Sequence, residues 1–554
     1  MNDLLREFAE TFAHGLRSNT LTTCSRWAEF RRIMGEPFPG PYGFKYHPWC
    51  RGITDSTASF NTAMKAAQMG VTEIAINRAL YTVDVLKRDV LYVLPTLTNA
   101  SDFSKARFST ALLNSPHLKT IFTDTNTVGL KQAGGVNLYI RGSRGDSNLK
   151  SIPVSTLILD EMDEMDQKQI WLALERLSGQ LVKNVWALST PTIPQYGVHR
   201  LFVQGTQEHF IFQCPRCNKW TEFIWPDCVE IIGETVSDPR CRESFLKCKE
   251  CQGRIEQREK PSFLKDGKWE VTAHNADPDT RSFYVNQLYS FTVSPAEIVV
   301  AHFRGIGDEA ASTEFHNSKL GMPYLGEGAQ VDDTKIDACI RNHTKNDPKP
   351  VIGGERFITM GIDQGKWNHI VVIEWFIKEM SRDINVATVG KLLWEGKLLG
   401  AEFDRLDQLM RDWQVLQCVI DADPEINEAR RFARRFPGYV TLCRYRRGVT
   451  GKEISLTEDE LGAPIATVDR TNWIDAALSR FHTPRLLLPR DLSREFREHI
   501  KAEVRTYVKD EHKNPKAVYV ETGPDHFCHA LTYAEIALPL AASYVSNKSI
   551  GAFL

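Results

Sequence analysis

The sequence contains no long apolar run, and this absence excludes one class of protein. No stretch approaches the ~20 consecutive apolar residues that a membrane-spanning helix needs. The opening residues, MNDLLREFAETFAHGLRS, carry acidic side chains among their apolar positions and form no signal-peptide core. We therefore expect no contact with a membrane, and we expect the protein to stay in the compartment in which it is made.

The sequence also lacks a large net charge, since it contains 68 Lys and Arg residues and 70 Asp and Glu residues. Any contact with nucleic acid must then come from local basic patches. Twelve cysteines in 554 residues are too few for a scaffold held together by disulfides. Eight of them are scattered, as reduced thiols in a cytosol would be, and four are grouped.

What the sequence does have is enough chain for two or three domains. From about residue 56 to 212, short apolar runs such as DVLYVLPTL and VSTLILDE alternate with amphipathic helical patterns, which predicts a mostly parallel sheet with helices on both faces. A polar segment with Pro and Gly, residues 341–355, precedes a second α/β pattern. Its three consecutive strands, RFITMGIDQG, HIVVIEWFIKE and INVATVGKLLWEG, are followed by helix, strand, helix and strand, the order expected of a ribonuclease-H-like fold.

The stretch KAAQMGVTE, residues 65–73, has part of the pattern of a phosphate-binding loop. Gly70 is followed two residues later by Thr72, but Val71 stands where the usual lysine would be. Because a cation near the β- and γ-phosphates is required electrostatically, Lys65 at the start of the loop is the candidate. Gly70 permits close approach of the backbone, and the Thr72 hydroxyl could bind Mg²⁺. Alone, the pattern is weak, since a glycine that begins a helix also explains it.

An acidic pair follows a buried strand in STLILDE, where Asp160 and Glu161 emerge at its carboxyl end. Ligands bind at this edge of open α/β sheets. Asp160 suits the carboxylate that holds Mg²⁺, and Glu161 suits the one that polarises the attacking water. A solvated acidic helix start is the alternative for this run, and it explains Asp163 and the acids after it. A later strand ends in LSTPT, residues 188–192, whose hydroxyls could sense a γ-phosphate or simply form a turn.

Four cysteines form two C-x2-C pairs, CPRC and CKEC, separated by thirty residues. Two such pairs bring four thiolates within tetrahedral reach, which predicts a structural Zn²⁺ site that does no catalysis. The predicted ligands are Cys214, Cys217, Cys248 and Cys251. Cys228 and Cys241 lie between the pairs and are either spare ligand candidates or small core residues.

Three aspartates of the second α/β pattern lie at the ends of predicted elements. Asp363 ends the first strand, Asp421 ends the fourth, and Asp525 begins the long amphipathic helix of GPDHFCHALTYAEIAL. The first and fourth strands are neighbours in a ribonuclease-H-like sheet, so the three carboxylates could hold two Mg²⁺ or Mn²⁺ ions for phosphodiester cleavage. Singly, each has a plainer explanation as a turn, loop or helix-cap residue.

Other residues near this second candidate site have open roles. Asp423 competes with Asp421 for one role, and His526 or His529 could assist. Basic side chains also gather after the fourth strand and could line a DNA groove through phosphate contacts, although a solvated surface explains each of them singly. They are Arg430, Arg431, Arg434, Arg435, Arg444, Arg446 and Arg447, with Tyr445 among them.

The loop, the acidic strand, the cysteine pairs and the second α/β region, in this order, resemble the large terminase subunit of tailed phages, most closely its lambda-like branch. The resemblance extends from about KYHPWCRGITDS to HALTYAEIAL. In that branch the loop lysine is displaced to the first position, so the resemblance implies that Lys65 carries the charge and that Gln68 fills a position common to arginine or glutamine. LSTPT, with Thr190, resembles the coupling motif, and FHNSKLGMPY resembles the segment that closes the ATPase region.

The resemblance also implies residues around the nucleotide. YHPWC resembles the stretch near the adenine, which implicates Tyr46 or Trp49. The candidates for a trans-acting arginine are Arg141, Arg144 and Arg200, and Arg144 is preferred because GSRGDSNLKS resembles a family loop. The implied nucleotide-binding residues are Lys65, Gln68, Gly70, Val71, Thr72, Asp160, Thr190 and Arg144. In the last helix His529 stands where many relatives have a second acid, so the third nuclease ligand rests on Asp525 alone.

As a member of this family, the protein would use ATP to move double-stranded DNA through a portal into a procapsid, and would cut concatemers with a two-metal endonuclease. The implied cofactors are ATP, Mg²⁺ or Mn²⁺, and Zn²⁺. The implied partners are double-stranded DNA, a small terminase subunit and the portal, with a homo-oligomeric ring as the active form in the host cytoplasm. The catalytic residues would be Glu161, Asp363, Asp421 and Asp525.

Two other functions fit parts of the sequence. A helicase-nuclease of repair or transposition would need a second motor domain, for which residues 261–345 are too short. A non-enzymatic DNA-binding scaffold stabilised by zinc would have a decayed loop. The predicted regions are a helical segment (1–40), a P-loop ATPase core (41–212), a zinc-binding module (213–260), a helical region that closes the ATPase (261–345) and a ribonuclease-H-like nuclease (346–554).

Overall fold

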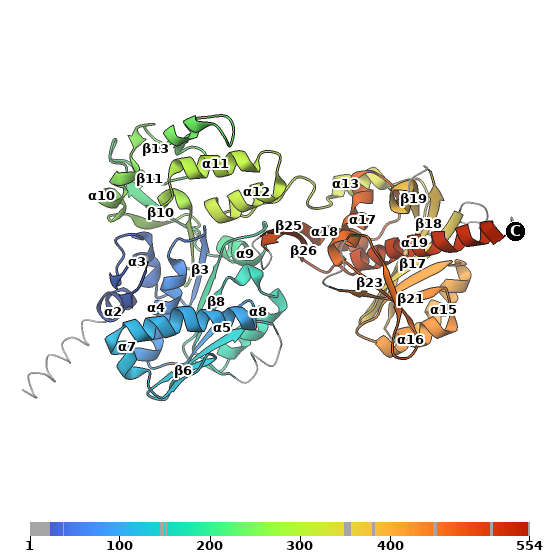
Figure 1. Ribbon diagram of the computed structural model, residues 1–554, viewed down its shortest axis with the longest axis horizontal. Helices are drawn as coiled ribbons and strands as arrows, with labels where there is room; N and C mark the ends of the chain where they lie inside the picture. Colours follow the sequence, from blue (N-terminus) through green and yellow to red (C-terminus); the bar gives the residue numbers. More distant parts are fainter. Residues whose placement is uncertain are drawn as a thin grey trace, which may run out of the picture. The chain divides into compact units, whose positions relative to one another are not determined.

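The computed structural model describes residues 23–36, 38–144, 149, 152–347, 356–378, 383–400, 402–446, 451–509 and 514–551. Most of the predicted N-terminal helical segment, residues 1–22, lies outside these ranges. The chain forms two compact units, Met1–Leu325 and Gly326–Leu554 (Figure 1). The second unit begins before the predicted boundary at 345 and 346, because helix α13 (Asp333–Cys339) buries Ile336 and Cys339 in its core.

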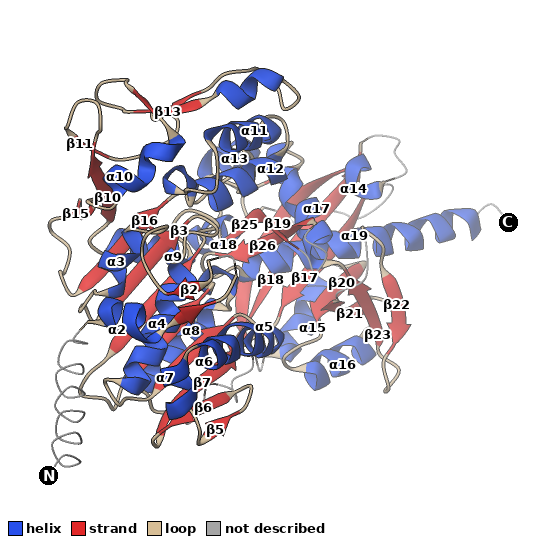
Figure 2. Ribbon diagram, turned by 60° about the vertical axis from the view of Figure 1, so that its left-hand side comes forward, coloured by secondary structure: helices blue, strands red, loops and turns tan. Residues whose placement is uncertain are grey.

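The first unit is built on an eleven-stranded sheet whose central strands are parallel (Figures 1 and 2). The order is β11-β10-β16-β3-β9-β8-β4-β7-β6-β5, with β15 paired to β10. The parallel strands are β10 (Glu208–Gln213), β16 (Thr280–Val285), β3 (Phe60–Lys65), β9 (Asn184–Ser189), β8 (Thr156–Asp160), β4 (Val90–Leu94) and β7 (Val136–Gly142). The antiparallel strands at the margins are β5 (Thr125–Asn126), β6 (Leu130–Ala133), β11 (Trp220–Thr221) and β15 (Lys268–Val271).

Both faces of the central strands are buried, as expected for parallel strands covered by helices. Side chains along a strand point alternately to the two faces. In β4, Tyr92 enters the core beneath α4, whereas Leu91 and Val93 enter the core beneath α8 and α9. The helices of this unit are α2 (Cys24–Arg31), α3 (Trp49–Thr54), α4 (Val71–Asp84), α5 (Leu97–Phe103), α6 (Thr110–Asn114), α7 (Pro116–Ile121), α8 (Gln167–Leu174), α9 (Gly197–Gln204), α10 (Lys260–Leu264), α11 (Pro295–Gly305) and α12 (Glu309–Glu314), with π-helical turns at Ser104–Ser109 and Phe315–Leu320.

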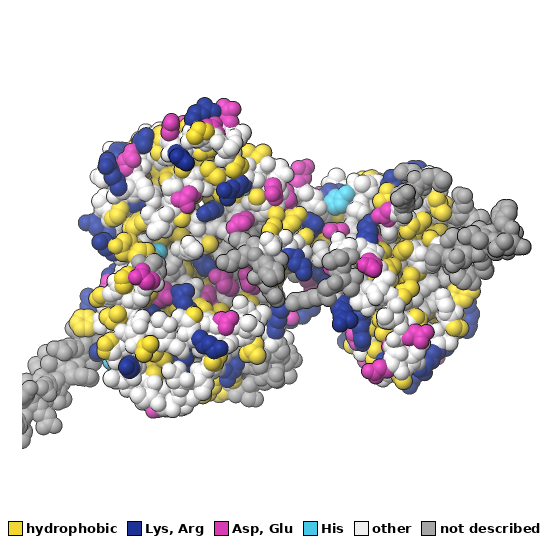
Figure 3. All heavy atoms as spheres, in the orientation of Figure 1, with side chains coloured by type: hydrophobic (Ala, Val, Ile, Leu, Met, Phe, Trp, Pro, Cys, Tyr) yellow, Lys and Arg dark blue, Asp and Glu magenta, His cyan; other side chains and the backbone are white. Residues whose placement is uncertain are grey.

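The cysteine-rich region forms its own small sheet of three antiparallel strands. These are β12 (Val229–Glu230), β13 (Phe245–Lys247) and β14 (Arg254–Ile255). Another short pair, β1 (Ile33–Met34) and β2 (Gly40–Pro41), lies near the start of the unit. On the face that Figure 3 shows, basic and acidic side chains of this unit are interspersed, as its sequence composition suggests.

The second unit has an eight-stranded mixed sheet, and its strand order confirms the ribonuclease-H-like pattern. The order is β22 (Ser455–Glu458), β23 (Pro464–Val468), β21 (Val440–Tyr445), β20 (Gln417–Asp421), β17 (Arg356–Asp363), β18 (Trp367–Ile377), β19 (Thr388–Leu399) and β24 (Leu486–Leu487). β17, β18 and β19 form an antiparallel meander, and β20 and β21 continue parallel to β17. The third strand begins later than predicted, because residues Ile384–Ala387 form the short helix α14.

Helices cover both faces of this sheet as well. The other helices are α15 (Phe403–Asp412), α16 (Ile426–Arg435), α17 (Arg470–His482), α18 (Arg494–Lys501) and α19 (His526–Gly551). A two-stranded hairpin, β25 (Glu503–Lys509) and β26 (Pro515–Glu521), precedes α19. α19 lies so close to β17 that a Cβ atom at Gly361 would overlap the carbonyl oxygen of Ala530 and the amide nitrogen of Ala534. Gly361 is therefore the residue that lets α19 reach the strand that ends at Asp363.

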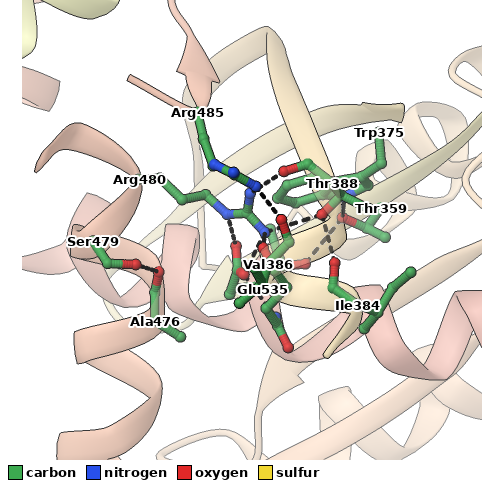
Figure 4. A network of polar contacts seen from close by, with 12 residues as sticks. Thr359, Trp375, Ile384, Val386, Thr388, Ala476, Ser479, Arg480, Arg485 and Glu535 are labelled. Carbon is green, nitrogen blue, oxygen red and sulfur yellow. Dashed lines mark hydrogen bonds and ion pairs between the residues drawn. The ribbon is translucent and has the colours of Figure 1, made fainter. Parts of the chain in front are cut away.

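A buried ion pair fixes α17 against α19 (Figure 4). Arg480 donates from Nε and Nη2 to the two oxygens of Glu535, at 2.6 and 2.7 Å, and both side chains are almost fully buried. The Arg480 guanidinium also donates to the carbonyl oxygen of Thr388 at 3.0 Å and lies 4.4 Å over the ring of Trp375. A buried pair of this kind depends on such additional contacts, since they offset the cost of removing two charges from water.

No helix within the described ranges combines the length and the apolar character that crossing a bilayer requires.

Candidate functional site

Hydrogen bonds to its backbone hold the loop between β3 and α4 in place. The Trp49 indole N–H donates to the carbonyl oxygen of Met69 at 2.9 Å, and the Gln287 amide donates to that of Ala67 at 2.8 Å. The N–H of Ala67 in turn donates to the carbonyl oxygen of Ser318 at 2.9 Å. Ser318 belongs to FHNSKLGMPY, so the structure places the segment predicted to close the ATPase region directly on the loop.

Gly70 ends the loop in the left-handed region, with φ of 79°, and α4 begins at Val71. A Cβ at Gly70 would lie 3.0 Å from the ring of His47 and 3.3 Å from Sγ of Cys50, so both conformation and space favour glycine. Gln68 also has a positive φ, 60°. Val71 is buried in the core, which leaves only its backbone to face a ligand, and Thr72 is half-buried in the first turn.

Lys65 is the last residue of β3 and is buried. Its ammonium Nζ donates to Oε1 of Glu161 at 2.9 Å and to the hydroxyl of Thr190 at 3.3 Å. Burial disfavours the charged ammonium, but the carboxylates of Glu161 and Asp160 outweigh burial and raise the pKa of Lys65. The structure thus brings the first residue of the loop, the acidic strand motif and LSTPT to one point at the carboxyl edge of the sheet.

Asp160 is fully buried at the end of β8. The Tyr92 hydroxyl donates to its Oδ2 at 2.6 Å, while Oδ1 has no hydrogen-bond partner among the described residues. Burial and the neighbouring Glu161 raise the pKa of Asp160 to about 6. A buried carboxylate oxygen without a hydrogen-bond partner among the described residues, next to the predicted phosphate-binding loop, fits the ligand set of Mg²⁺. Glu161 follows with a positive φ of 58° and a side chain that is partly exposed.

Asp163 is a functional candidate that sequence reasoning missed, because the sequence favoured a solvated helix start for it. It is buried, and its Oδ2 accepts from the N–H and the hydroxyl of Thr192, at 2.9 and 3.0 Å. Its Oδ1 accepts from the N–H of Val198 at 2.7 Å. Burial raises the pKa of Asp163 to about 7. Asp163 therefore ties the acidic strand end to the segment that follows LSTPT.

The other predicted residues of this site have different surroundings. Trp49 is fully buried, whereas Tyr46 is exposed and stacks on Phe38 with ring centroids 4.5 Å apart. Arg144 is exposed. Burial and the charge of Glu161 raise the pKa of Glu164, and the charge of Arg144 partly opposes this increase. Arg107 of the π-helical turn was not among the predicted arginines. It binds Glu73 at 2.5 Å, and its charge lowers the pKa of Asp160, although burial raises that pKa overall.

The remaining arginine candidates, Arg141 and Arg200, have different surroundings. Arg141 donates to the carbonyl oxygens of Gly129 and Ile140 and lies over the ring of Tyr139. Arg200 lies on α9, the helix whose first turn contacts Asp163.

The four predicted cysteines come together, with all four Sγ atoms within 4.8 Å of one another. The two turns that carry them are alike, because Asn218 and Gln252 have positive φ angles of 61° and 57° and donate their N–H groups to Cys214 and Cys248 carbonyl oxygens. The N–H of Arg216 also points at Sγ of Cys214, at 3.3 Å, and that of Glu250 points at Sγ of Cys248, at 3.4 Å. Burial raises the pKa of the Cys214 thiol to about 12, whereas the backbone N–H groups directed at its sulfur lower the pKa and so favour the thiolate that binds a metal.

Cys228 and Cys241, which lie between the pairs, are not part of this cluster. Both are buried, and their thiols donate to the backbone carbonyl oxygens of Glu222 and Thr235. They are therefore core residues in this structure.

In the second unit, the register of the sheet places two of the predicted aspartates side by side. β17 and β20 are parallel, with Ile362 opposite Ile420, so Asp363 and Asp421 leave the sheet together at its carboxyl edge. Burial raises the pKa of Asp421 to about 6, and the charge of Asp363 adds to the shift. The N–H of Asp423 donates to Oδ1 of Asp421 at 3.2 Å, so Asp423 supports Asp421 through its backbone.

The third predicted aspartate, Asp525, lies in a different group of side chains. Nε2 of His529 lies 3.2 Å from its Oδ2, and the buried Glu503 completes the group. Burial disfavours the charge of Asp525, but His529 outweighs burial and holds the pKa of Asp525 well below its usual range. Burial raises the pKa of Glu503 to about 7, although Arg470 binds it. Glu503 and Arg470 were missed because they lie on separate elements far from the predicted motifs.

Asp363 belongs to another group, with His369 and His526. Nδ1 of His526 lies 2.9 Å from Oδ2 of Asp363. Since Asp525 and His526 are adjacent at the start of α19, this helix connects the two groups. Sequence reasoning named His526 as a possible assistant but had no signal for His369.

The basic cluster after β20 is largely engaged in ion pairs. Arg444 binds Asp423 at 3.1 Å, and a cavity of about 510 Å³ opens beside Arg430, Arg444, Tyr445 and Arg446. The other pairs are Arg430 with Asp459, Arg431 with Glu428 and Arg435 with Asp407. Arg447 lies outside the described residues.

Comparison with known proteins identifies two family models along the chain. Residues 37–269 match the model of the phage terminase large subunit gpA, ATPase domain, and residues 280–434 match that of the terminase large subunit gpA, endonuclease domain. The second match begins at β16, which is hydrogen-bonded between β10 and β3 in the first sheet. The physical boundary is therefore later than the family model places it.

Solved structures of similar proteins include the HK97 bacteriophage large terminase, 11% identical over 93% of this chain and 99% of that chain, with a TM-score of 0.47. The Thermus phage P74-26 large terminase ATPase domain is 14% identical over 52% of this chain and 95% of that chain, with a TM-score of 0.29. The large terminase nuclease from thermophilic phage G20c is 13% identical over 36% of this chain and 95% of that chain, with a TM-score of 0.21. None of the curated proteins compared with this sequence matches it.

The family assignment rests on the two family models, which match consecutive parts of the chain and describe the two domains of one kind of protein. The first model spans the loop, the acidic strand and the cysteine cluster, and the second spans Asp363 and Asp421. The chain therefore belongs to the phage terminase large subunit family, and it joins an ATPase to a DNA endonuclease in a DNA-packaging motor.

Proposed function

We propose that this packaging motor binds ATP where β3 meets α4, with Lys65 as the cation that faces the phosphates. The observation that carries this proposal is the buried Lys65 ammonium, which contacts both Glu161 and Thr190. The backbone N–H groups at the start of α4 would bind phosphate. The Thr72 hydroxyl and the Asp160 carboxylate would hold Mg²⁺, which supplies positive charge to the phosphate oxygens.

Glu161 would orient the water that attacks the γ-phosphate. In the structure this carboxylate binds Lys65, so phosphates compete with Glu161 for the ammonium. Binding of ATP would then release Glu161 toward water. Thr190 contacts Lys65, and Thr192 contacts Asp163. The change of partner at Lys65 would therefore reach the segment after β9 and couple the binding of nucleotide to movement of that segment.

Substitution of Lys65 by Ala tests this assignment. We expect ATP hydrolysis by the full chain to fall by about 10²- to 10³-fold, because the substitution removes the charge facing the phosphates. Phosphate release in the presence of DNA measures it. Lys119→Ala, which removes an exposed lysine on α7, should hydrolyse ATP as the parent does. Unchanged hydrolysis in Lys65→Ala would show that ATP does not bind at this loop.

For the nuclease, we propose that Asp363, Asp421 and Asp525 hold the two Mg²⁺ or Mn²⁺ ions that activate water and stabilise the leaving oxygen. The parallel register of β17 and β20 supports the first two residues. The contact of His526 with Asp363 supports the third, because it places the start of α19 at the same edge. Asp423 and Arg444 would lie at the rim, where the arginine can exchange its partner for a phosphate of DNA.

Cleavage of supercoiled plasmid by the full chain tests the nuclease assignment. We expect Asp363→Asn to abolish cleavage and to leave ATP hydrolysis intact, since the two sites lie on separate sheets. Asp404→Asn, at an exposed position of α15, is the matched control. Cleavage that persists in Asp363→Asn means that the metal site lies elsewhere.

We also assign one structural Zn²⁺ to Cys214, Cys217, Cys248 and Cys251, on the strength of their clustered sulfur atoms. Metal analysis of the purified chain should find one equivalent of zinc. Cys251→Ser should lose it, and Cys241→Ser should retain it, because Cys241 lies outside the cluster. Equal zinc in both variants contradicts the assignment.

The remaining roles come from the family. We propose that the active motor is a homo-oligomeric ring in the host cytoplasm, which works with a small terminase subunit and docks on the portal of a procapsid. Arg144 is our candidate for the arginine that reaches a neighbouring subunit, since it is exposed and acts electrostatically on Glu164.

A further inference from the structure

Two histidines surround Asp363 because of how the second unit folds. In the antiparallel pair of β17 and β18, His369 is the direct cross-strand partner of Asp363. The first residue of α19, His526, contacts the same carboxylate, with Nδ1 2.9 Å from Oδ2. The rings of His369 and His526 are stacked, with centroids 4.6 Å apart and an angle of 11°.

The buried side of this group offers a nitrogen atom that could bind a metal. His369 is 4% exposed, and its Nδ1 is buried without a hydrogen-bond partner among the described residues. A neutral imidazole with a free nitrogen lone pair is the form that binds a metal.

The distances also suit an ion. One donor atom from each of Asp363, His369 and His526 lies within 4.8 Å of the others. Two ligands bound at about 2.1 Å on adjacent positions of a metal lie about 3 Å apart, close to the separation of Asp363 and His526. His526 is half-exposed, so the group is open on one side.

A third histidine supports the group from behind. His499 of α18 accepts a hydrogen bond at Nδ1 from the N–H of Phe527, at 3.3 Å. Its ring lies 5.5 Å from that of His369 and 5.7 Å from that of His526. Because Phe527 follows His526 directly, this contact holds the start of α19 in place.

We propose that Asp363, His369 and His526 bind one divalent transition-metal ion, and that these imidazoles make the nuclease prefer Mn²⁺ to Mg²⁺. Mg²⁺ favours oxygen ligands and keeps its water shell, whereas imidazole nitrogen suits transition ions. The proposal rests on the proposed nuclease site at Asp363 and names two ligands and an ion preference for it.

The test measures Mn²⁺ binding by electron paramagnetic resonance on the full chain as purified. We expect the bound ion to show nitrogen couplings from imidazole. His369→Gln and His526→Gln should each remove one coupling and weaken Mn²⁺ binding about tenfold. His482→Gln, an exposed position of α17, is the matched control and should bind as the parent does.

Cleavage supplies a second readout. The ratio of plasmid cleavage in Mn²⁺ to that in Mg²⁺ should fall in His369→Gln and His526→Gln. His526→Glu, which replaces nitrogen by oxygen at the open side, should shift the preference toward Mg²⁺. Circular dichroism and thermal unfolding identify any variant that fails to fold, and the other histidine variant then carries the test.

The outcomes separate this inference from the nuclease assignment. Two results would contradict the histidine ligands and leave the nuclease assignment untouched. One is Mn²⁺ that binds to the parent without any nitrogen coupling. The other is nitrogen couplings and an ion preference that stay unchanged in both glutamine variants. Cleavage that survives in Asp363→Asn overturns the nuclease site itself. Loss of cleavage in Asp363→Asn with normal ion preference in both histidine variants leaves the nuclease standing and removes the inference.

Discussion

In the first unit, the carboxylates at the end of β8 face an ammonium group, whereas in the second unit the carboxylate at the end of β17 faces two imidazoles. Both groups lie where parallel strands end, the usual position of ligands in open α/β sheets. The carboxylates around Lys65 raise its pKa and so favour its positive charge, and under our proposal this ammonium would exchange a carboxylate for phosphate. The imidazoles of histidine offer nitrogen lone pairs, so they suit an ion that is itself the source of charge.

If the two sites lie where we propose, the difference is how one kind of sheet edge would support two phosphate chemistries. At the edge where we propose that ATP binds, a nucleotide would bind and leave in every cycle, and the ion pair of Lys65 with Glu161 would satisfy the charges between cycles. The edge proposed for the nuclease has separate groups around Asp363 and Asp525, which the start of α19 joins. We therefore expect the two edges to respond differently to substitution.

The largest effect should come from Glu161→Gln. ATP hydrolysis should fall by about 10³-fold because the water loses its orienting carboxylate. ATP itself should bind more tightly, because its phosphates would no longer compete with a carboxylate for the Lys65 ammonium. Phosphate release and equilibrium nucleotide binding measure the two effects. Glu175→Gln, at an exposed position, should change neither, and weaker ATP binding in Glu161→Gln would contradict the exchange of partners at Lys65.

Gly361→Ala should give the next largest effect, and it should act on the second unit alone. A methyl group there overlaps the backbone of α19, so we expect a loss of about 3 kcal/mol in the stability of this unit. DNA cleavage should fall while ATP hydrolysis remains. Denaturant unfolding measures the loss. Gly365→Ala, whose new methyl would have no neighbour closer than 3.6 Å, is the control, and equal stability of the two variants would contradict the close packing.

Acid pH should weaken both edges to a similar and smaller extent. Burial raises the pKa values of Asp160 and Asp421 to about 6, so both carboxylates gain protons as the pH falls through this value. Metal binding needs the ionised forms. Between pH 7 and pH 5, each activity at limiting Mg²⁺ or Mn²⁺ should fall about tenfold. Initial rates across this range measure it, and a flat profile for either activity breaks the parallel between the edges.

Much of the fold could be predicted because it depends on local pattern. Alternating apolar residues and interposed helical periodicity predicted two α/β regions, and the strand order of the second sheet confirmed the ribonuclease-H-like arrangement. Gly70 was singled out by its place in a motif, and the structure gives it the positive φ that glycine favours. Domain boundaries were harder, because Pro and Gly mark loops whether or not a unit ends there.

By itself, the sequence determined which residues could do chemistry: Lys65, the pair at Asp160, the four grouped cysteines and the aspartates at strand ends. Only the tertiary structure decided their partners. Strand register placed His369 opposite Asp363, and close packing at Gly361 brought His526 to the same carboxylate. His526 lies 163 positions from Asp363. No local periodicity encodes such contacts, because they depend on how whole elements pair and pack.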